Sequence, residues 1–459
     1  MLHWLLPRHR LDAKGVLGTV LFLALAPSLA AAQTPARDSA RSGPDAMAGP
    51  LGIPMARMGS GTSWTPEADP LPSRQFTAGA WNLMVHGAAF GQYDVQHGPR
   101  GGRQLGSLSW GMLMASRAAA GGRLTLRGMF SLDPLGVGAC GYPLLLQTGE
   151  TCHGQPLVDR QHPHDAVMEL DAEYERAISR TVGILAYAAP VGEPALGPVA
   201  FMHRASAAHD PMAPLGHHWQ DATHVTFGVV TAGVFTRTLR LEGSVFNGHE
   251  PDENRWNFDP IQLNSYSARA TYDPGPNWSL TTGYGFISRP EALHPGESVH
   301  RLVASAAFAT ALGGGGRFAA TAIVGSNATS GGQGVTNSAL VEADFSPDGR
   351  NAFFGRAELV DKTAEELGVA GFGAARKFRV AESSLGFERR VIRAAGLAIG
   401  VGFLGTANAV PADLAGAYGS RTPLAIDVYL RVTPARAPAG ATMDMNMPAM
   451  GQSNEEVRQ

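Results

Sequence analysis

Residues 423–433 read PLAIDVYLRVT, and apolar and polar side chains alternate through most of this stretch. The apolar set is Leu424, Ile426, Val428, Leu430 and Val432, and the polar set is Asp427, Tyr429 and Arg431. Successive side chains of a strand point to opposite faces, so the stretch predicts a strand with one apolar and one polar face. In a transmembrane β-barrel the apolar face meets lipid and the polar face lines the lumen.

The same alternation recurs along the chain and predicts about 16 strands. Single-chain bacterial barrels have an even number of strands, and 14 or 18 would also fit the pattern. The other predicted strands are residues 76–93, 104–119, 123–133, 166–176, 181–189, 223–235, 264–272, 278–288, 317–326, 338–345, 375–392 and 397–405, with three more around 239–245, 301–308 and 353–359. In the fourth strand, Met168 is grouped with the lipid-facing Leu170 and Tyr174.

The links between these strands alternate between short and long, which is typical of an outer-membrane barrel with short periplasmic turns and long extracellular loops. The short links are residues 121–122, 179–180, 236–238, 273–277, 313–316, 346–350 and 393–396. The long links are residues 94–103, 134–165, 190–222, 248–263, 289–298, 327–337, 362–374 and 406–422. The fold class is therefore predicted to be all-β, a transmembrane antiparallel up-and-down barrel, with both ends of the barrel on the short-turn side. The lead-in or an inward-folded loop could narrow its interior.

The chain is predicted to have four parts. Residues 1–32 resemble a signal peptide, because Arg8, Arg10 and Lys14 precede an apolar run at 15–26 that is too short to span a bilayer, with cleavage expected after Ala32. Residues 33–73 form a flexible periplasmic lead-in, residues 74–433 the barrel, and residues 434–459 a Met-rich flexible tail. The predicted localisation is the bacterial outer membrane.

The composition of the chain indicates which kinds of partner it can bind and how its cysteines are used. The chain has 459 residues, of which 16% are charged, and a net charge of -3, which argues against a nucleic-acid partner. Cys140 and Cys152 are its only cysteines, and a local pair in an exported protein predicts a disulfide. Two free thiols or a metal-binding pair are the alternatives.

The tail carries a dense group of methionines: Met443, Met445, Met447 and Met450. Thioether sulfur is a soft ligand that suits Cu(I), and methionine gains no packing benefit in a solvated tail. We therefore treat these residues as candidate copper ligands, with chance occurrence as the alternative.

Histidines gather in two of the long loops. The candidate ligands there are His162, His164, Asp165, His209, His217 and His218. Imidazole binds Cu, Zn, Ni and Fe, and a neighbouring carboxylate can complete or orient a site. The alternative is that these side chains only hydrogen-bond the loops to one another and to the barrel rim. A metallohydrolase using the segment 162–165 is a further alternative, although its ligand spacing is off by one residue.

Charged residues of both signs fall on the predicted lumen face: Arg127, Glu169, Asp171, Glu173, Arg240, Glu242, Arg356 and Glu358. Such residues either line an aqueous pore or pair across the lumen and stiffen it. Because neither sign dominates, strong anion or cation selectivity is not predicted.

The leader, Met-bearing ends and all-β body resemble the copper resistance protein B family of outer-membrane proteins. Residues 52–55 (GIPM), 59–64 (GSGTSW), 141–150 (GYPLLLQTGE) and 159–165 (DRQHPHD) resemble segments of a largely uncharacterised family of bacterial outer-membrane β-barrels. The resemblance implies a barrel fold and, through the first family, copper handling, and it carries over no catalytic residue.

The predicted function is passage or handling of small solutes or metal ions, with copper the leading ion. A general porin or surface-binding receptor without metal specificity and an outer-membrane hydrolase are the alternatives, and an enzyme is not expected. No cofactor is required, and a copper ion is the candidate ligand. The expected partners are outer-membrane lipid, small solutes or metal ions, and two further copies of the chain in a homotrimer.

Overall fold

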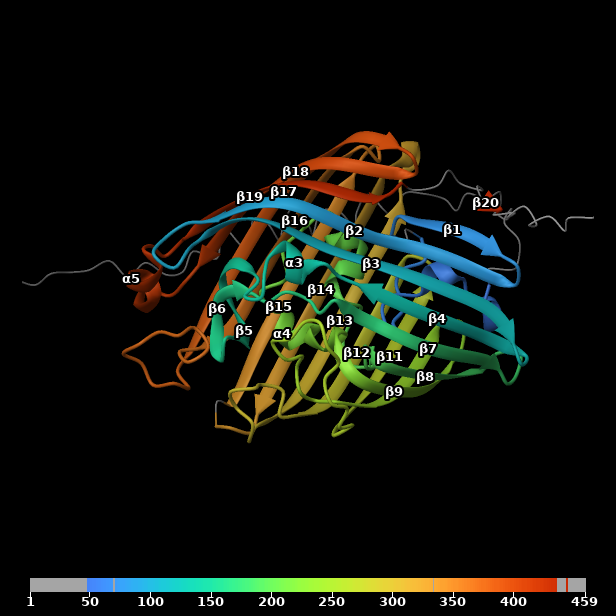
Figure 1. The fold of residues 1–459 in the computed structure, drawn as a ribbon, viewed down its shortest axis with the longest axis horizontal. Helices are drawn as coiled ribbons and strands as arrows, with labels where there is room; N and C mark the ends of the chain where they lie inside the picture. Colours follow the sequence, from blue (N-terminus) through green and yellow to red (C-terminus); the bar gives the residue numbers. More distant parts are fainter. Residues whose placement is uncertain (1–47, 69–70, 333, 436–442, 445–459) are drawn as a thin grey trace, which may run out of the picture.

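The computed structural model describes residues 48–68, 71–332, 334–435 and 443–444. Sixteen antiparallel strands close into a barrel, as predicted (Figure 1). They are β2 (Trp81–Gln96), β3 (Arg103–Ala119), β4 (Gly122–Phe130), β7 (Val167–Ala177), β8 (Gly183–Gly192), β9 (Thr226–Phe235), β10 (Leu239–Phe246), β11 (Ser265–Gly275), β12 (Trp278–Ser288), β13 (Ser298–Ala311), β14 (Arg317–Thr329), β15 (Gly334–Ser346), β16 (Asn351–Thr363), β17 (Lys377–Ala394), β18 (Leu397–Ala409) and β19 (Leu424–Pro434). Among the described residues, no helix has the length and hydropathy needed to cross a membrane.

The exterior of the barrel is apolar and the interior is polar. On β19, Leu424, Ile426, Val428 and Leu430 are each 51–53% exposed, while Asp427 and Tyr429 are 2% and 1% exposed. Unpaired backbone groups are costly in lipid, so a sheet with such an exterior must join its own edges. It does so where β19 pairs with β2, from Ala425 opposite Gln96 to Val432 opposite Ala89.

The closing seam differs from the prediction of one strand over residues 76–93. The chain turns at residues 79–80, and β1 (Ser73–Ala78) folds back on β2, pairing from Ser73 opposite His86 to Ala78 opposite Trp81. A glycine with φ of 59° at Gly79 makes this tight reversal without strain. β1 therefore continues along the edge of β2 that β19 leaves free, and the two together complete one wall of the barrel.

Links of two to five residues join the strands at one end of the barrel, at 120–121, 178–182, 236–238, 276–277, 312–316, 347–350 and 395–396. The links at the other end are residues 97–102, 131–166, 193–225, 247–264, 289–297, 330–333, 364–376 and 410–423. The latter include α3 (Asp133–Gly136), α4 (His217–Gln220) and α5 (Ala415–Tyr418). Which end faces the cell exterior stays a prediction.

The loop at 131–166 is more ordered than the irregular link expected there. It contains a hairpin of β5 (Tyr142–Cys152) and β6 (Gln155–Gln161), which pair from Tyr142 opposite Gln161 to Cys152 opposite Gln155. A disulfide joins Cys140 and Cys152, whose Cα atoms are 5.4 Å apart. The hairpin lies near the long-link end of the barrel (Figure 1).

Met168 is the one residue of the fourth predicted strand that was assigned to the wrong face. It is fully buried, and so is its neighbour Glu169. The pairing of β4 with β7 skips Met168, because Met129 lies opposite Glu169 and Phe130 opposite Val167. Such a bulge breaks the two-residue period, so Met168 turns inward although its sequence parity points to lipid.

The lead-in was expected to be flexible, but its described part is packed against the barrel wall. Residues 48–68 form 3-10 turns at Pro50–Gly52 and Met55–Arg57, and residues 57–64 are all buried. Arg57 pairs with Asp273 at 2.8 Å, and Arg240 donates to the backbone oxygen of Thr62 at 2.7 Å. These contacts hold the segment in place, because a buried charge is costly unless it is paired or hydrogen-bonded, and the segment supplies those partners.

The tail is described only at Met443 and Asp444, which form β20 (Met443–Asp444), parallel to β1. The other candidate tail ligands, Met445, Met447 and Met450, and the predicted signal peptide lie outside the described residues.

Candidate functional site

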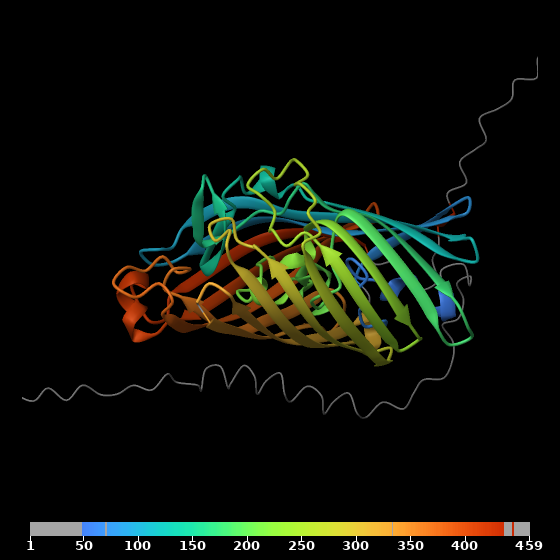
Figure 2. The ribbon, with the colours of Figure 1, turned by 90° about the horizontal axis from the view of Figure 1, so that it is seen from below.

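Residues 193–225, which link β8 to β9 and are called the inner loop here, run through the barrel interior (Figure 2). None of them is exposed. Two wall glycines make room for its backbone. A Cβ at Gly283 would lie 1.6 Å from the Leu196 oxygen, and one at Gly325 would lie 2.3 Å from the Trp219 oxygen. The inner loop thus rests directly on the wall where side chains are absent.

Five histidines, two from the link 131–166 and three from the inner loop itself, meet in the barrel and are called the imidazole cluster here. Its members are His162, His164, His217, His218 and His224. Ring centroids of neighbouring members lie 5.1–5.8 Å apart, from His218 through His162 and His217 to His224 and His164. The two sequence segments that were predicted to supply metal ligands are therefore brought together.

Each ring of the imidazole cluster has an orienting partner. The Nδ1 atom of His217 lies 2.7 Å from Asp221, that of His164 lies 2.8 Å from Asp133, and that of His218 lies 3.1 Å from Glu250. A carboxylate on one ring nitrogen fixes the tautomer and directs the other nitrogen elsewhere, as in metal sites.

Burial favours the neutral form of four of these rings. It lowers the pKa of His162, His217 and His218, and it lowers the pKa of His224 to about 3. The Nε2 atoms of His164, His218 and His224 are buried and have no hydrogen-bond partner among the described residues. A neutral imidazole with a free ring nitrogen is the form that binds transition metals.

One end of the imidazole cluster also offers carboxylates. Ligand atoms of His218, Glu250 and Glu291 all lie within 4.8 Å of one another. Burial raises the pKa of Glu250 to about 7 and that of Glu291 to about 8, and in both cases a neighbouring carboxylate adds to the effect. Like-charged carboxylates that are held together out of water are stabilised by a bound cation.

Two of the predicted ligands lie apart from the imidazole cluster. His209 pairs with Asp344 on β15, and its ring stacks on Phe354. Asp165 faces Arg255 at 3.4 Å. Asp165 is thus engaged by an ion pair, and His209 by a hydrogen bond to a carboxylate.

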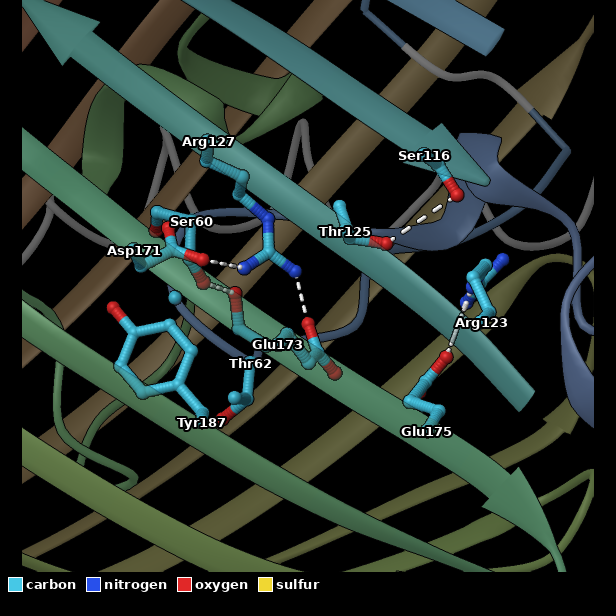
Figure 3. Close-up of polar contacts among 12 residues, drawn as sticks. Ser60, Thr62, Ser116, Arg123, Thr125, Arg127, Asp171, Glu173, Glu175 and Tyr187 are labelled. Carbon is cyan, nitrogen blue, oxygen red and sulfur yellow. Dashed lines mark hydrogen bonds and ion pairs between the residues drawn. The ribbon is translucent and has the colours of Figure 1, made fainter. Parts of the chain in front are cut away.

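The predicted lumen-facing charges are all buried, and Figure 3 shows part of the set, in which Arg127 faces Asp171 and Glu173. Arg127 donates to Asp171 at 2.8 Å and also to Glu173. Arg240 lies between Glu173 and Glu175 at 2.7 and 2.9 Å. These residues stiffen the wall and anchor the two segments that fill the lumen, the inner loop and residues 57–64.

Charged residues of β15 and β16 make similar contacts, and some of them bind the inner loop. Arg356 pairs with Glu342 at 3.0 Å, and Glu358 accepts hydrogen bonds from the backbone nitrogens of Leu215 and Gly216 at 2.9 and 2.8 Å. Glu242 pairs with Arg269 at 3.0 Å, and Glu169 accepts from the Gly61 nitrogen at 2.9 Å. A charge that is held in such a pair contributes little to the selection of permeant ions.

A hollow of about 450 Å³ lies among the long links and is lined in part by Glu150, His249 and Glu250, and two small hollows lie beside the inner loop. One, of about 60 Å³, is lined by Trp110, His162 and His164, and the other, of about 70 Å³, by Met84, His86 and His203. Each has room for a metal ion or a few water molecules.

Five residues of this interior are not among the ligands predicted from the sequence: His86, Met112, Met129, His203 and His224. His203 and His224 stand in the same loop as the predicted ligands, so the density of histidine there was a usable signal. Met112 and Met129 fall on the polar-face parity of β3 and β4, and a methionine at such a position is the signal that could have found them.

A closed antiparallel cylinder with an apolar exterior and a polar interior defines the class of transmembrane β-barrels of bacterial outer membranes. No family model matches the chain, and no curated protein matches it. The structure is similar to that of Salmonella typhi OmpF in complex with daunomycin, at 10% identity and a TM-score of 0.49, over 78% of this chain and 99% of that one.

Two further solved structures are similar at comparable distances. The outer membrane channel DcaP of Acinetobacter baumannii has 7% identity and a TM-score of 0.46, over 79% of this chain and 99% of that one. The anion-selective porin from Comamonas acidovorans has 10% identity and a TM-score of 0.43, over 77% and 99%. The class is defined by the closed wall and apolar exterior of the chain itself.

Proposed function

We propose that this barrel binds transition-metal ions in its interior and passes them across the outer membrane, with copper the leading ion. The observation that carries the proposal is the imidazole cluster, in which three buried Nε2 atoms have no hydrogen-bond partner among the described residues. A buried polar nitrogen without a partner costs about 1–3 kcal/mol, so a cluster of three calls for a ligand. Imidazoles joined by carboxylates suit Cu(II) and Zn(II).

The filling of the lumen supports ions as the cargo. The inner loop and residues 57–64 are buried inside the wall, and the two hollows beside them have volumes of about 60 and 70 Å³. A dehydrated ion fits such a space, whereas a sugar requires the inner loop to move. The neutral imidazoles then form a series of exchange sites, weak enough to release what they bind.

The test measures metal binding and metal flux on the purified full-length barrel. Calorimetry with Cu(II) and Zn(II) is expected to give at least micromolar affinity, and His218→Ala with His224→Ala is expected to weaken it by more than about tenfold. The matched control is His97→Ala, because His97 is exposed in the link 97–102. Absence of micromolar binding, or equal binding by the double variant, rules the proposal out.

A general porin is the second candidate, favoured by the mixed charges of the wall, which typify lumens that pass small polar solutes. Proteoliposome swelling in arabinose separates the two functions. Fast swelling that is insensitive to the histidine variants supports the porin, and slow swelling with fast Cu(II) or Zn(II) entry supports metal passage. The tail methionines, the copper specificity and the homotrimer remain predictions, and chemical cross-linking of the barrel in native membranes tests the last of these.

A further inference from the structure

Eight methionines gather at one side of the barrel interior. They are Met55, Met58, Met84, Met112, Met114, Met129, Met168 and Met202, and all of them are at most 8% exposed. Methionine fills irregular gaps well, so packing between the wall and the inner loop is the simplest account of most of them. Two of the eight do something more, because their sulfur atoms face histidine nitrogens.

The register of the wall builds this arrangement. His86 on β2 lies opposite Met112 on β3, and Met112 lies opposite Met129 on β4. All three side chains point into the lumen and are buried. Directly opposite residues have Cβ atoms about 4.5–5.5 Å apart, so the pairing alone sets three donor groups side by side.

The inner loop supplies the fourth group. A 3-10 turn at Phe201–His203 brings His203 against the same wall, where its Nε2 atom lies 3.3 Å from the sulfur of Met129. The Nε2 atom of His86 lies 3.1 Å from the sulfur of Met112. The two imidazole rings are 5.1 Å apart, and the Trp110 ring lies 5.3 Å from one and 4.5 Å from the other.

These distances fit shared ligation better than hydrogen bonding. A thioether is a weak acceptor, so two buried imidazole nitrogens gain little by facing sulfur. Two ligands that each lie about 2.0–2.3 Å from one metal ion are roughly 3–4 Å from each other. The two nitrogen–sulfur distances fall in that range.

We infer that His86, Met112, Met129 and His203 form a binding site for a soft monovalent ion, Cu(I), within the barrel. The inference deepens the proposed function, because it names the oxidation state that this part of the interior holds. Thioethers favour Cu(I) over the harder divalent ions, and four neutral ligands suit a single positive charge. The Trp110 ring beside the site offers a further cation–π contact.

The row continues to a negative charge. Glu169 on β7 lies opposite Met129, and its Oε2 atom is buried without a hydrogen-bond partner among the described residues. Its other carboxylate oxygen is already engaged by the Gly61 nitrogen and by the Tyr187 hydroxyl, at 2.9 and 3.2 Å. Glu169 therefore compensates the charge of an ion that the four neutral groups hold.

The test is competition for Cu(I) between the purified full-length barrel and a bathocuproine chelator. Wild-type protein is expected to retain one Cu(I) per chain more than a Met112→Leu/Met129→Leu variant, in which leucine keeps most of the volume. The tail is present in both proteins, so its methionines cancel in the difference. Met168→Leu is the matched control, because Met168 belongs to the same group of eight and lies on a neighbouring strand.

A second readout does not depend on stoichiometry. Ag(I) is expected to quench the fluorescence of Trp110, and the quenching should be absent from Trp110→Phe and from the double methionine variant. If the double variant does not fold, His203→Asn in the inner loop takes its place, since it leaves the wall strands intact. The inference is wrong if the double variant retains as much Cu(I) as wild type, or if Met168→Leu loses an equal amount. The variant His218→Ala/His224→Ala, which removes two rings of the imidazole cluster, is expected to retain Cu(I). That result would show that the Cu(I) site does not depend on the imidazole cluster, so the two proposals can fail separately.

Discussion

Adjacent residues of the inner loop face opposite walls and are held by opposite kinds of contact. His203 meets the sulfur of Met129 on β4, whereas Arg204 pairs with Glu342 on β15 at 2.6 Å and with Asp221 at 2.8 Å. On the first wall the contacts are soft and neutral, and on the second they are buried ion pairs whose side chains are 1% exposed. The ion pairs fix the inner loop, and the neutral side carries the Cu(I) site that we propose.

The largest expected effect comes from breaking the charged side. Arg204→Ala leaves Glu342 and Asp221 without one of their cations, and removing one partner of a buried pair costs about 3–5 kcal/mol. We expect the denaturant midpoint of the barrel to fall and arabinose swelling to speed up as the inner loop is released. The control is Arg376→Ala, because the Arg376–Asp413 pair is about half exposed and is worth at most about 1 kcal/mol. Equal effects of the two variants would show that the inner loop is held by something else.

Acid is expected to loosen the inner loop by a smaller amount. Burial lowers the folded-state pKa of His224 to about 3, so between pH 6.5 and 3 the unfolded chain binds more protons. The contribution of His224 to stability is therefore full above pH 6.5 and declines as the pH falls, by at most about 3 kcal/mol at pH 4.5. Glu250 and Glu291, whose pKa values are raised to about 7 and about 8, act in the opposite direction in this window. The lowered pKa of Asp221 has no influence in this window, because its contribution is lost only below its unfolded value of about 3.8. Thermal unfolding at pH 7.5 and 4.5 checks this, and His224→Gln should reduce the difference.

The smallest effect is expected on the neutral side. Met129→Leu keeps the side-chain volume and removes only sulfur, so the free energy of unfolding should change by less than about 1.5 kcal/mol. Denaturant titration measures this change, while Cu(I) retention should fall sharply in the same protein. A large loss of stability would mean that the methionines serve packing and not ligand binding.

The wall could be predicted from the sequence because its rule is local. Alternation along residues 423–433 states both the strand and its two faces, and lipid enforces the pattern at every strand. The rule fails at Met168, where a bulge that depends on pairing with β4 reverses the face, and at Gly79, where a turn interrupts an apparently continuous strand.

The interior could be predicted only in part. Histidine density marked residues 162–164 and 217–218, but nothing local says that two links about 50 residues apart converge. The contact of His86 with Met112 depends on strand register, which is fixed by turn lengths and by the whole ring of pairings. Arg127 and Glu173 were both expected on the lumen face, and only the structure reveals that they are partners and that the inner loop and lead-in rest on such pairs.

The divided seam has a consequence for biogenesis. Residues 48–68 come immediately before β1 in the chain, and β1 and β19 share one edge of β2 (Figure 1). The last strand of the barrel to be synthesised, β19, is thus the neighbour of the first, and residues 48–68 are attached to the chain at that point. These residues must enter the lumen before or while β19 pairs with β2, because a barrel that closed earlier would leave them outside.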